Sequence, residues 1–403
     1  EAAMASTTTE GAGASRPAAG TGGIRAPARV RSIDVLRGLV IVLMALDHVR
    51  DYFTNVRYEP TDLAKTSVAL FFTRWITHYC APTFIFLAGT SAYLLSRKLD
   101  RPALQRFLLT RGLWLVLLEF SVVSFVWSFN FLYKLGLVMQ VIWATGISMC
   151  FLAGLVYLPT VAVGAVGVVM IAGHNLLDGI PPARFGGWAP LWNIIHVQGE
   201  LPFGLALYPL VPWIGVMASG YAFGACYRLD GETRTRRQLA LGAGLIALFL
   251  IVRGINVYGD LQPWAAQRDV LWTVMSFINV TKYPPSLAYV TMTLGPALLL
   301  LAAFEHLPGG RLARALETLG RVPMFAYVLH LAIAHLLAGV LGLVWLDTPV
   351  ILTNIFVFYP DAWGVGLGSV YVAWLVVLAC LYPLCRWFAA LKRQRTDWWL
   401  AYL

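Results

Sequence analysis

Long apolar stretches, separated by shorter polar segments, run through most of the chain. Ten of them approach or exceed the about 20 residues that a helix needs to cross a bilayer, and they lack the short alternation typical of barrel strands. We therefore predict an all-α fold, a polytopic transmembrane helical bundle of about ten spans. The predicted spans are 33–52, 79–96, 104–127, 135–156, 158–176, 207–227, 238–257, 286–306, 320–344 and 366–391. The run 66–77 predicts a further interfacial helix that leads into the second span.

The N-terminal segment differs from the rest of the chain. Residues 1–31 are rich in Ala, Gly, Thr and Arg and contain no apolar run, so we predict a disordered tail followed by one transmembrane domain over 32–398. The composition of the whole chain agrees with a membrane protein. Hydrophobic residues make up 59% of the chain and charged residues only 12%, against about 25% charged in a soluble domain. These values exclude a water-soluble globule.

Basic residues are distributed unevenly between the two sides of the predicted bundle. Of the 30 Lys and Arg residues, 20 lie in segments on the side of the N-terminus and 9 on the opposite side. Because basic loops tend to stay in the cytoplasm, this bias predicts that both termini are cytoplasmic. It also accounts for the net charge of +10, so we expect no nucleic-acid partner.

The first predicted span carries the sharpest set of polar groups. Arg37 and His48 are eleven residues apart, so on a helix they lie within about 20° of the same face and about 16 Å apart along the axis. Asp34 lies one turn before Arg37 and can pair with it, and Asp47 adjoins His48. Taken singly, Arg37 can be explained as a basic residue that sets the orientation of the span, and His48 as a histidine at the membrane interface. Their shared face on an apolar helix favours a functional stripe, because ionisable groups inside spans are costly.

Three further ionisable residues lie in or near other spans. His78 stands at the outer mouth of the second span and is counted with His48 and Asp47 as a catalytic candidate. His330 lies near the middle of the membrane, where a histidine serves either a site or a helix–helix contact. Glu119 is the only carboxylate deep in its helix, and a substrate contact and a structural role fit it equally well.

The long outer loops supply the remaining candidates. His196 and Glu200 are four residues apart and are positioned to line an extracytoplasmic cavity, and we add Lys282 as a third substrate-binding candidate. Walker, dinucleotide-binding and H-E-x-x-H motifs are missing, and the five cysteines form no C-x-x-C pair, so we expect no metal. Several histidines and an arginine at the inner mouth instead suit proton transfer to and from an activated group.

Five segments together resemble the heparan-α-glucosaminide N-acetyltransferase-like family of bacterial membrane proteins, and the resemblance covers nearly all of 32–345. The segments are SIDVLRGLVIVLM (32–44), APTFIFLAGTSAYL (81–94), YPLVPWIGVMASGYAFG (208–224), KYPPSLAYVTMTLGPALLL (282–300) and LGRVPMFAYVLH (319–330). The resemblance implies ten or eleven helices in the bacterial inner (cytoplasmic) membrane. It also implies transfer of an acetyl group from cytosolic acetyl-CoA to an amine on a sugar across the membrane.

The first span is also similar to a signature of the transmembrane acyltransferases that modify envelope polysaccharides, an arginine followed eleven residues later by a histidine. In those relatives the histidine takes part in acyl transfer, which implies the same for His48. One departure concerns the lysosomal enzyme of the family, which carries a catalytic histidine in the first outer loop. The matching stretch around Val68 has no histidine, and His78 matches an aspartate. The resemblance therefore supports acyl-CoA use more strongly than an aminosugar acceptor or an acyl-histidine.

Together these features predict an acyl-CoA-dependent transmembrane acyltransferase. Acyl-CoA enters from the cytoplasm, where Arg37, paired with Asp34, and Arg321 meet its phosphates, and His330 lines the tunnel. His48 acts as general base or as a transient acyl carrier. The acceptor, an extracytoplasmic glycan or a small molecule, enters from the other side.

Two other classes of protein remain open. A non-catalytic transporter or permease for a small polar solute explains the spans and the polar groups equally well. It explains the stripe of Arg37 and His48 less well, and the inverted repeat of many transporters is missing. The second class is a structural partner in an envelope-assembly complex. A homo-oligomer is compatible with each interpretation.

Overall fold

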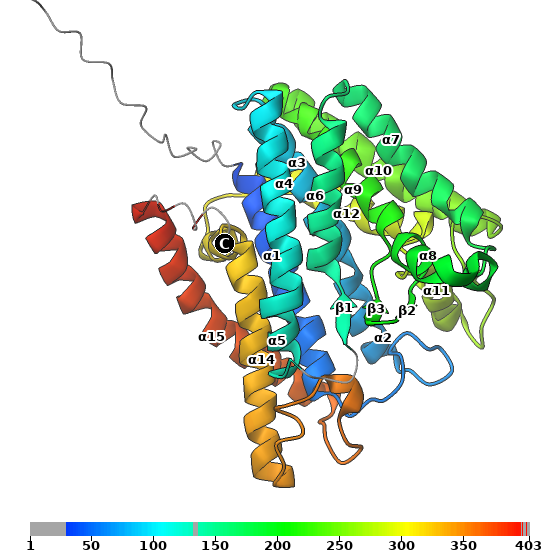
Figure 1. Ribbon diagram of the computed structural model, residues 1–403, viewed down its shortest axis with the longest axis vertical. Coiled ribbons are helices and arrows are strands. Elements are labelled where there is room, and N and C mark those ends of the chain that lie inside the picture. Colours follow the sequence, from blue (N-terminus) through cyan, green and yellow to red (C-terminus); the bar gives the residue numbers. More distant parts are fainter. Residues whose placement is uncertain (1–29, 132–135, 396, 398–399, 401–403) are drawn as a thin grey trace, which may run out of the picture.

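The computed structural model follows the predicted order of spans (Figure 1). It describes residues 30–131, 136–395, 397 and 400, so the predicted disordered tail 1–31 lies almost entirely outside the described residues. Helical segments run through all ten predicted spans, which confirms the polytopic helical bundle. They are α1 (Arg31–Phe53), α2, η1 and α3 (Val68–Trp75, Ile76–Tyr79 and Cys80–Ser96), α4, η2 and α5 (Arg101–Leu118, Glu119–Val123 and Ser124–Ser128), α6 (Val141–Leu155), α7 and η3 (Thr160–Gly173 and His174–Leu177), α9 and η5 (Leu210–Phe223 and Gly224–Arg228), α10 (Gly231–Ile255), α12 (Leu287–Glu305), α14 (Pro323–Leu346) and α15 (Leu367–Gln394).

Among the described residues, eight of these segments are long and apolar enough to cross a membrane. The other two are α1, whose 23 residues include six Asp and Arg, and α6, which has only 15 residues. The predicted span 135–156 is too long, because Leu137–Met139 pairs as a strand ahead of α6. The charged α1 is nevertheless well buried, which indicates that its polar groups are held by protein rather than by lipid.

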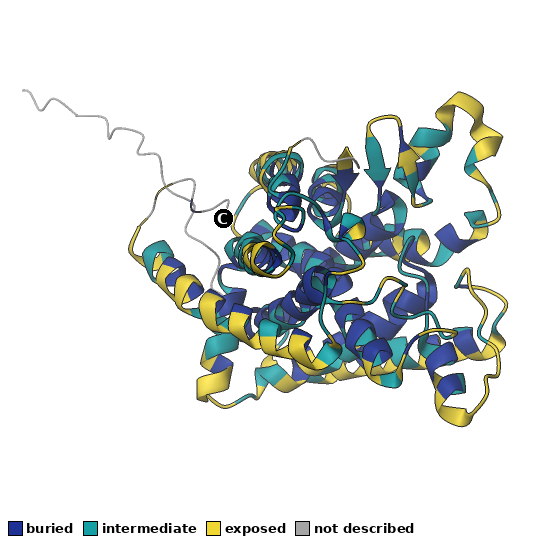
Figure 2. Ribbon diagram, turned by 90° about the horizontal axis from the view of Figure 1, so that it is seen from below, coloured by how far each residue is buried: buried dark blue, intermediate teal, exposed yellow. Residues whose placement is uncertain are grey.

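Burial divides the spans into a central and a peripheral set. Within its most apolar window, the segment Leu210–Arg228 is 78% buried, whereas Leu367–Gln394 is only 17% buried. Figure 2 shows the same division, with buried residues inside the bundle and exposed residues on outward helix faces. Exposed apolar side chains on the peripheral helices, such as Leu375 and Trp387 on α15, suit contact with lipid.

Close backbone contacts hold the central helices together. A Cβ atom added at Gly89 of α3 would collide with the carbonyl oxygen of Met217 on α9, and one added at Gly220 would collide with the carbonyl oxygen of Phe86. The hydroxyl of Thr90 donates a hydrogen bond to the carbonyl of Gly220 at 3.0 Å. Small residues at such crossings let helices approach closely where the hydrophobic effect does not drive association.

We call the end of the bundle at which α1 begins the inner end, because the charge bias predicts that it faces the cytoplasm, and the opposite end the outer end. The short helix α13 (Arg311–Gly320) packs on the first turns of α1 at the inner end. Most other non-spanning elements lie away from the inner end, in the middle and lower parts of Figure 1. These elements are η4 (Pro182–Trp188), α8 (Ala189–Ile195), α11 (Val270–Ile278) and η6 (Phe356–Phe358).

A small sheet, which the sequence pattern did not predict, lies among the outer elements. Its strands are β1 (Leu137–Met139), β2 (Gly199–Leu201) and β3 (Gly204–Ala206), in the order β1–β3–β2. β3 pairs in parallel with β1 and antiparallel with β2. The sheet fixes the chain just before α6 and just before α9, and both places contribute side chains to the cavity described next.

Candidate active site

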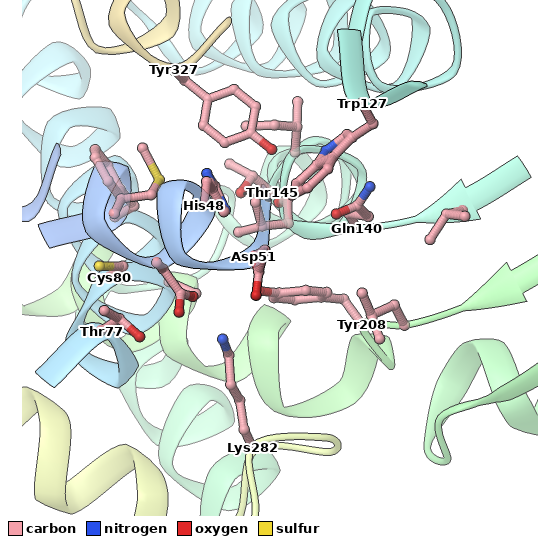
Figure 3. Close-up of a pocket in the computed structure, with 18 of the residues that line it drawn as sticks. His48, Asp51, Thr77, Cys80, Trp127, Gln140, Thr145, Tyr208, Lys282 and Tyr327 are labelled. Atoms are coloured by element: carbon pink, nitrogen blue, oxygen red, sulfur yellow. Dashed lines mark hydrogen bonds between the residues drawn. The ribbon is translucent and has the colours of Figure 1, made fainter. Parts of the chain in front are cut away.

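A cavity of about 1030 Å³ lies inside the bundle and is lined by residues from both of its ends. Arg37, Arg111 and Lys392 line it toward the inner end, and Lys282 lines it toward the outer end. His48 lies on the wall between these two regions, on α1 (Figure 3). The volume is at the upper limit of the about 300–1,000 Å³ that is usual for small-molecule sites.

His48 is held by a second histidine. Its Nδ1 atom lies 2.7 Å from Nε2 of His330 on α14, and the two rings are nearly parallel. Nδ1 of His330 lies 2.9 Å from the carbonyl oxygen of Ala326, one turn earlier on the same helix. The structure thus brings together two candidate histidines that lie 282 positions apart in the sequence. His330 does not line the cavity itself, in contrast to the prediction, because it is buried behind His48.

These contacts determine where the protons lie on the two neutral rings. A carbonyl oxygen only accepts, so Nδ1 of His330 carries the hydrogen and Nε2 of His330 is an acceptor. Nδ1 of His48 therefore donates to His330, and Nε2 of His48 keeps its lone pair. Within the described part of the chain, no hydrogen bond to Nε2 of His48 is found. This nitrogen is the proton acceptor that a general base requires.

Aromatic side chains fix the plane of the His48 ring. The ring of Trp127 meets it edge-on at a centroid distance of 5.0 Å, and Tyr327 lies at 6.2 Å in a similar orientation. Both aromatic residues line the cavity (Figure 3). The His48 imidazole is therefore restrained by a hydrogen bond on one side and by ring contacts on others.

Asp47 belongs to a network of ion pairs beside His48. Its carboxylate lies 3.0 Å from the guanidinium of Arg74 and 3.0 Å from that of Arg50, which also pairs with Asp51 at 2.6 Å. The four side chains are no more than 20% exposed. Asp47 lines the cavity, but its oxygens are engaged with arginines, which supports a role in positioning the outer end of α1.

Basic side chains gather where the cavity approaches the inner end. Arg37 pairs with Asp34 at 3.5 Å, as the sequence predicts, and it donates to the carbonyl of Leu87 and to the hydroxyl of Ser91 on α3. Arg111 and Lys392 line the same region. Neither Asp34 nor Arg321 lines the cavity, and Arg321 pairs with Glu317 on α13 instead.

The outer region of the cavity is polar. Lys282, a predicted substrate contact, projects into it with its ammonium group 5.0 Å from the centre of the Tyr283 ring (Figure 3). Gln140 and Tyr208 add an amide and a phenol. Burial raises the pKa of Tyr208 well above its ordinary value, so its hydroxyl stays protonated and can donate a hydrogen bond.

Two other predicted residues lie outside the cavity lining. Oε2 of Glu119 accepts hydrogen bonds from the backbone nitrogens of Ile142 and Trp143, at 3.0 and 2.9 Å, at the start of α6. A side-chain oxygen there satisfies free N–H groups at the start of the helix, which favours the structural alternative for Glu119. His78 is buried against Tyr289, whose hydroxyl donates to the His78 carbonyl at 2.8 Å.

The last two predicted residues separate from the main cavity. His196 is buried beside a smaller cavity at the outer end, where it meets Asp178. Glu200 lies on β2 with its side chain exposed, and it lines neither cavity. Their spacing of four residues crosses the end of α8 and the start of β2, so it does not place them on one helix face.

The sequence analysis did not select several residues that line the cavity. They are Arg111, Trp127, Gln140, Tyr208, Tyr327 and Lys392. Tyr208 and Tyr327 lie inside two of the segments that carry the family resemblance, so a signal was present for them. The others come from helices or loops whose local pattern is that of an ordinary span or an inner basic segment.

These features define a multi-pass membrane protein with His48 on the wall of an internal cavity and His330 in contact with it from behind that wall. The family model for the heparan-alpha-glucosaminide N-acetyltransferase catalytic domain matches residues 29–259, and the chain belongs to this family. Membership implies a membrane-embedded transferase of the acetyltransferase type. The matched range contains Arg37 and His48, whereas Lys282 and His330 lie beyond it. A comparison with curated proteins finds no match.

Proposed function

We propose that this protein transfers an acyl group, most simply acetyl, from cytosolic acyl-CoA to a hydroxyl or amine of an extracytoplasmic acceptor. The membrane is the bacterial inner membrane, and the acceptor is a glycan or another small envelope component. The observation that carries the proposal is the position of His48: it lies on a cavity that reaches residues at both ends of the bundle, with a ring nitrogen left to accept a proton.

Charge favours entry of acyl-CoA at the inner end. Three basic side chains, Arg37, Arg111 and Lys392, line the cavity there without a carboxylate among the lining residues of that end. The basic residues that line the outer end are accompanied by three carboxylates, Asp47, Asp51 and Glu59. Arginine suits phosphate groups because its planar guanidinium donates two parallel hydrogen bonds. A thioester directed outward from this region reaches His48 after about 16 Å, the rise of eleven residues of helix.

The acceptor would meet the thioester from the outer region. Its nucleophilic oxygen or nitrogen attacks the thioester carbonyl carbon while Nε2 of His48 removes the proton. The tetrahedral intermediate then breaks its C–S bond, and the CoA thiolate leaves with the proton returned by His48. In the alternative course, His48 itself attacks and carries the acyl group until the acceptor takes it. The amide of Gln140, the phenol of Tyr208 and the ammonium of Lys282 suit a polyhydroxylated acceptor.

His330 acts on the reaction through His48 in this proposal. We expect His330→Leu to lower turnover strongly, because Nδ1 of His48 loses its acceptor and the ring loses its fixed tautomer. His330→Gln keeps an acceptor oxygen and should recover part of the rate. Turnover and melting temperature are measured for both variants. Equal rates for the two variants would mean that His330 only fills space.

Arg37 is expected to contribute to acyl-CoA binding. Arg37→Ala should raise the dissociation constant about tenfold or more, since a hydrogen bond to a charged group contributes about 1.5–3 kcal/mol. Isothermal titration with acetyl-CoA measures the effect. The matched control is Arg97→Ala, which removes an exposed charge at the same end of the bundle outside the cavity. If both variants bind like the wild type, Arg37 serves only to tie α1 to α3.

The activity itself is tested with purified protein in liposomes. Labelled acetyl-CoA is supplied at the inner end, and a pool of envelope glycans and small polyols at the outer end. The proposal predicts free CoA and an acetylated acceptor in equal amounts. Movement of a solute across the membrane without CoA release would instead identify a transporter.

A further inference from the structure

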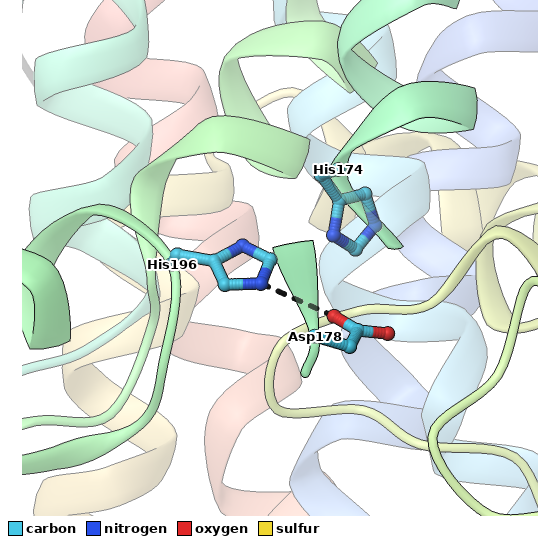
Figure 4. Close-up of side chains that lie close together, drawn as sticks. All are labelled: His174, Asp178 and His196. Atoms are coloured by element: carbon cyan, nitrogen blue, oxygen red, sulfur yellow. Dashed lines mark ion pairs between the residues drawn. The ribbon is translucent and has the colours of Figure 1, made fainter. Parts of the chain in front are cut away.

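Three side chains with metal-ligating atoms converge at the outer end of α7, apart from the histidine pair of the candidate active site (Figure 4). His174 and Asp178 lie on the turn that follows α7, and His196 directly follows α8. One ligand atom from each residue lies within 4.8 Å of the other two. Two imidazoles and one carboxylate form a donor set that suits first-row transition metals.

Both imidazoles are buried and poorly satisfied by hydrogen bonds. His174 is 2% exposed and His196 0% exposed. Neither ring nitrogen of either residue makes a well-aligned hydrogen bond within the described part of the chain, although Nε2 of His196 lies 3.1 Å from Oδ1 of Asp178 and the His174 ring lies near the backbone of Pro285. Buried polar atoms without partners are uncommon and call for a water or an ion that satisfies them. Because the nitrogens and a carboxylate converge, an ion satisfies them better than a single water.

A neighbouring amide holds the carboxylate in place. The side-chain nitrogen of Asn175 donates to Oδ2 of Asp178 at 2.7 Å, and its side-chain oxygen accepts from the backbone nitrogen of Leu287 at 3.0 Å. Oδ2 is thereby engaged, and Oδ1 points toward His196 (Figure 4). Such outer contacts orient a ligating carboxylate and typically change metal affinity by about 10–100-fold when removed.

The cluster borders a cavity of about 240 Å³. Asp178 and His196 line this cavity together with Gln198, Leu261 and Tyr283. Three protein ligands beside an open space are the arrangement in which zinc keeps a fourth position for water or another small ligand. Gln198 and Tyr283 also line the larger cavity, so the two cavities share part of one wall.

We propose that His174, Asp178 and His196 bind a divalent first-row transition metal, with a fourth coordination position directed to the smaller cavity. The metal joins the turn after α7 to the segment after α8 and so fixes the outer elements next to Tyr283. Sequence analysis predicted no metal, because the ligands come from two separate loops without a recognised spacing. The inference does not depend on the proposed acyl transfer.

Zinc is the probe for this site. Protein without a histidine tag is dialysed against a chelator and titrated with Zn²⁺, and its melting temperature and bound metal are measured. We expect one tightly bound Zn²⁺ per chain and a higher melting temperature. Asn175→Ala should weaken zinc binding about 10–100-fold, and His174→Phe and Asp178→Asn should weaken it further. Mg²⁺ at millimolar concentration should not compete.

Two variants make the test selective. His174→Phe replaces a poorly satisfied imidazole by an apolar ring, so the chelated variant should fold at least as well as the chelated wild type, and zinc should no longer raise its melting temperature. His306→Gln changes an exposed histidine at the end of α12 and should bind zinc like the wild type. Absence of zinc binding by the wild type, competition by Mg²⁺, or full binding by His174→Phe would each overturn the proposal.

Discussion

Replacing His48 by alanine is expected to lower the rate of acyl transfer by about 10²–10⁴-fold, the usual loss when a general base is removed. Acyl-CoA binding should remain nearly intact, because the basic residues that line the inner end of the cavity are unchanged. The variant also leaves His330 without its donor, but the bond from His330 to the carbonyl of Ala326 persists. The fold should therefore survive, with at most a small change in melting temperature.

The control for this variant is another buried histidine. His335 contacts the backbone carbonyls of Val126 and Ile351 at 2.9 Å each, stacks on Phe129, and does not line the cavity. His335→Ala should therefore lower the melting temperature and leave turnover per folded molecule roughly unchanged. Consumption of acyl-CoA with a pool of envelope glycans, measured beside the melting temperature, separates the two behaviours. Wild-type turnover by His48→Ala would show that His48 is a packing residue.

The fold was largely predictable because the bilayer imposes one simple rule on sequence. A span needs about 20 mostly apolar residues, so the positions of ten spans follow from hydropathy. The predicted span boundaries are wrong where tertiary contacts, and not hydropathy, decide the local structure. Leu137–Met139 is apolar enough to extend a span, but it pairs with β3, and only tertiary contact decides between these outcomes. β1 pairs with a strand that lies far away in the sequence, so no local pattern indicates this pairing, whereas β2 and β3 are neighbours joined by a two-residue turn.

The candidate site was predictable only in part. Arg37 and His48 share one helix face, so their relation follows from helix geometry alone. His330 was identified as a polar residue inside a span, but its pairing with His48 depends on how α14 packs against α1. The role of Glu119 at the start of α6 depends on a helix contact in the same way. Residue type shows that a buried polar group needs a partner, whereas packing decides which partner it has.

Asp47 shows most clearly how packing can favour a role other than the one that the sequence predicts. Sequence analysis counted it as catalytic because it adjoins His48. Its carboxylate instead lies between the guanidinium groups of Arg50 and Arg74, each at 3.0 Å. Arg50 keeps a second partner in Asp51, at 2.6 Å. Without Asp47, the guanidinium of Arg74 would retain one ion pair among the described residues, with the exposed Glu59 at 3.5 Å.

We therefore expect Asp47→Ala to lower the free energy of unfolding by about 3–5 kcal/mol, the usual cost of leaving a buried charge without its partner. The matched control is Arg236→Ala, which breaks an exposed ion pair with Glu232 on α10 and should cost about 1 kcal/mol or less. Denaturation in mixed detergent micelles, followed by circular dichroism, measures both values.

The double variant Asp47→Leu with Arg74→Met distinguishes a positioning role from a catalytic one. It removes both charges of the pair, and apolar replacements of a whole buried pair are often neutral, so much of the lost stability should return. Acyl transfer should return with it, because His48 and His330 keep their contact while α1 is again firmly held. If stability returns but turnover stays at the level of Asp47→Ala, the carboxylate acts on the reacting groups directly, and Asp47 belongs with His48 in the chemistry.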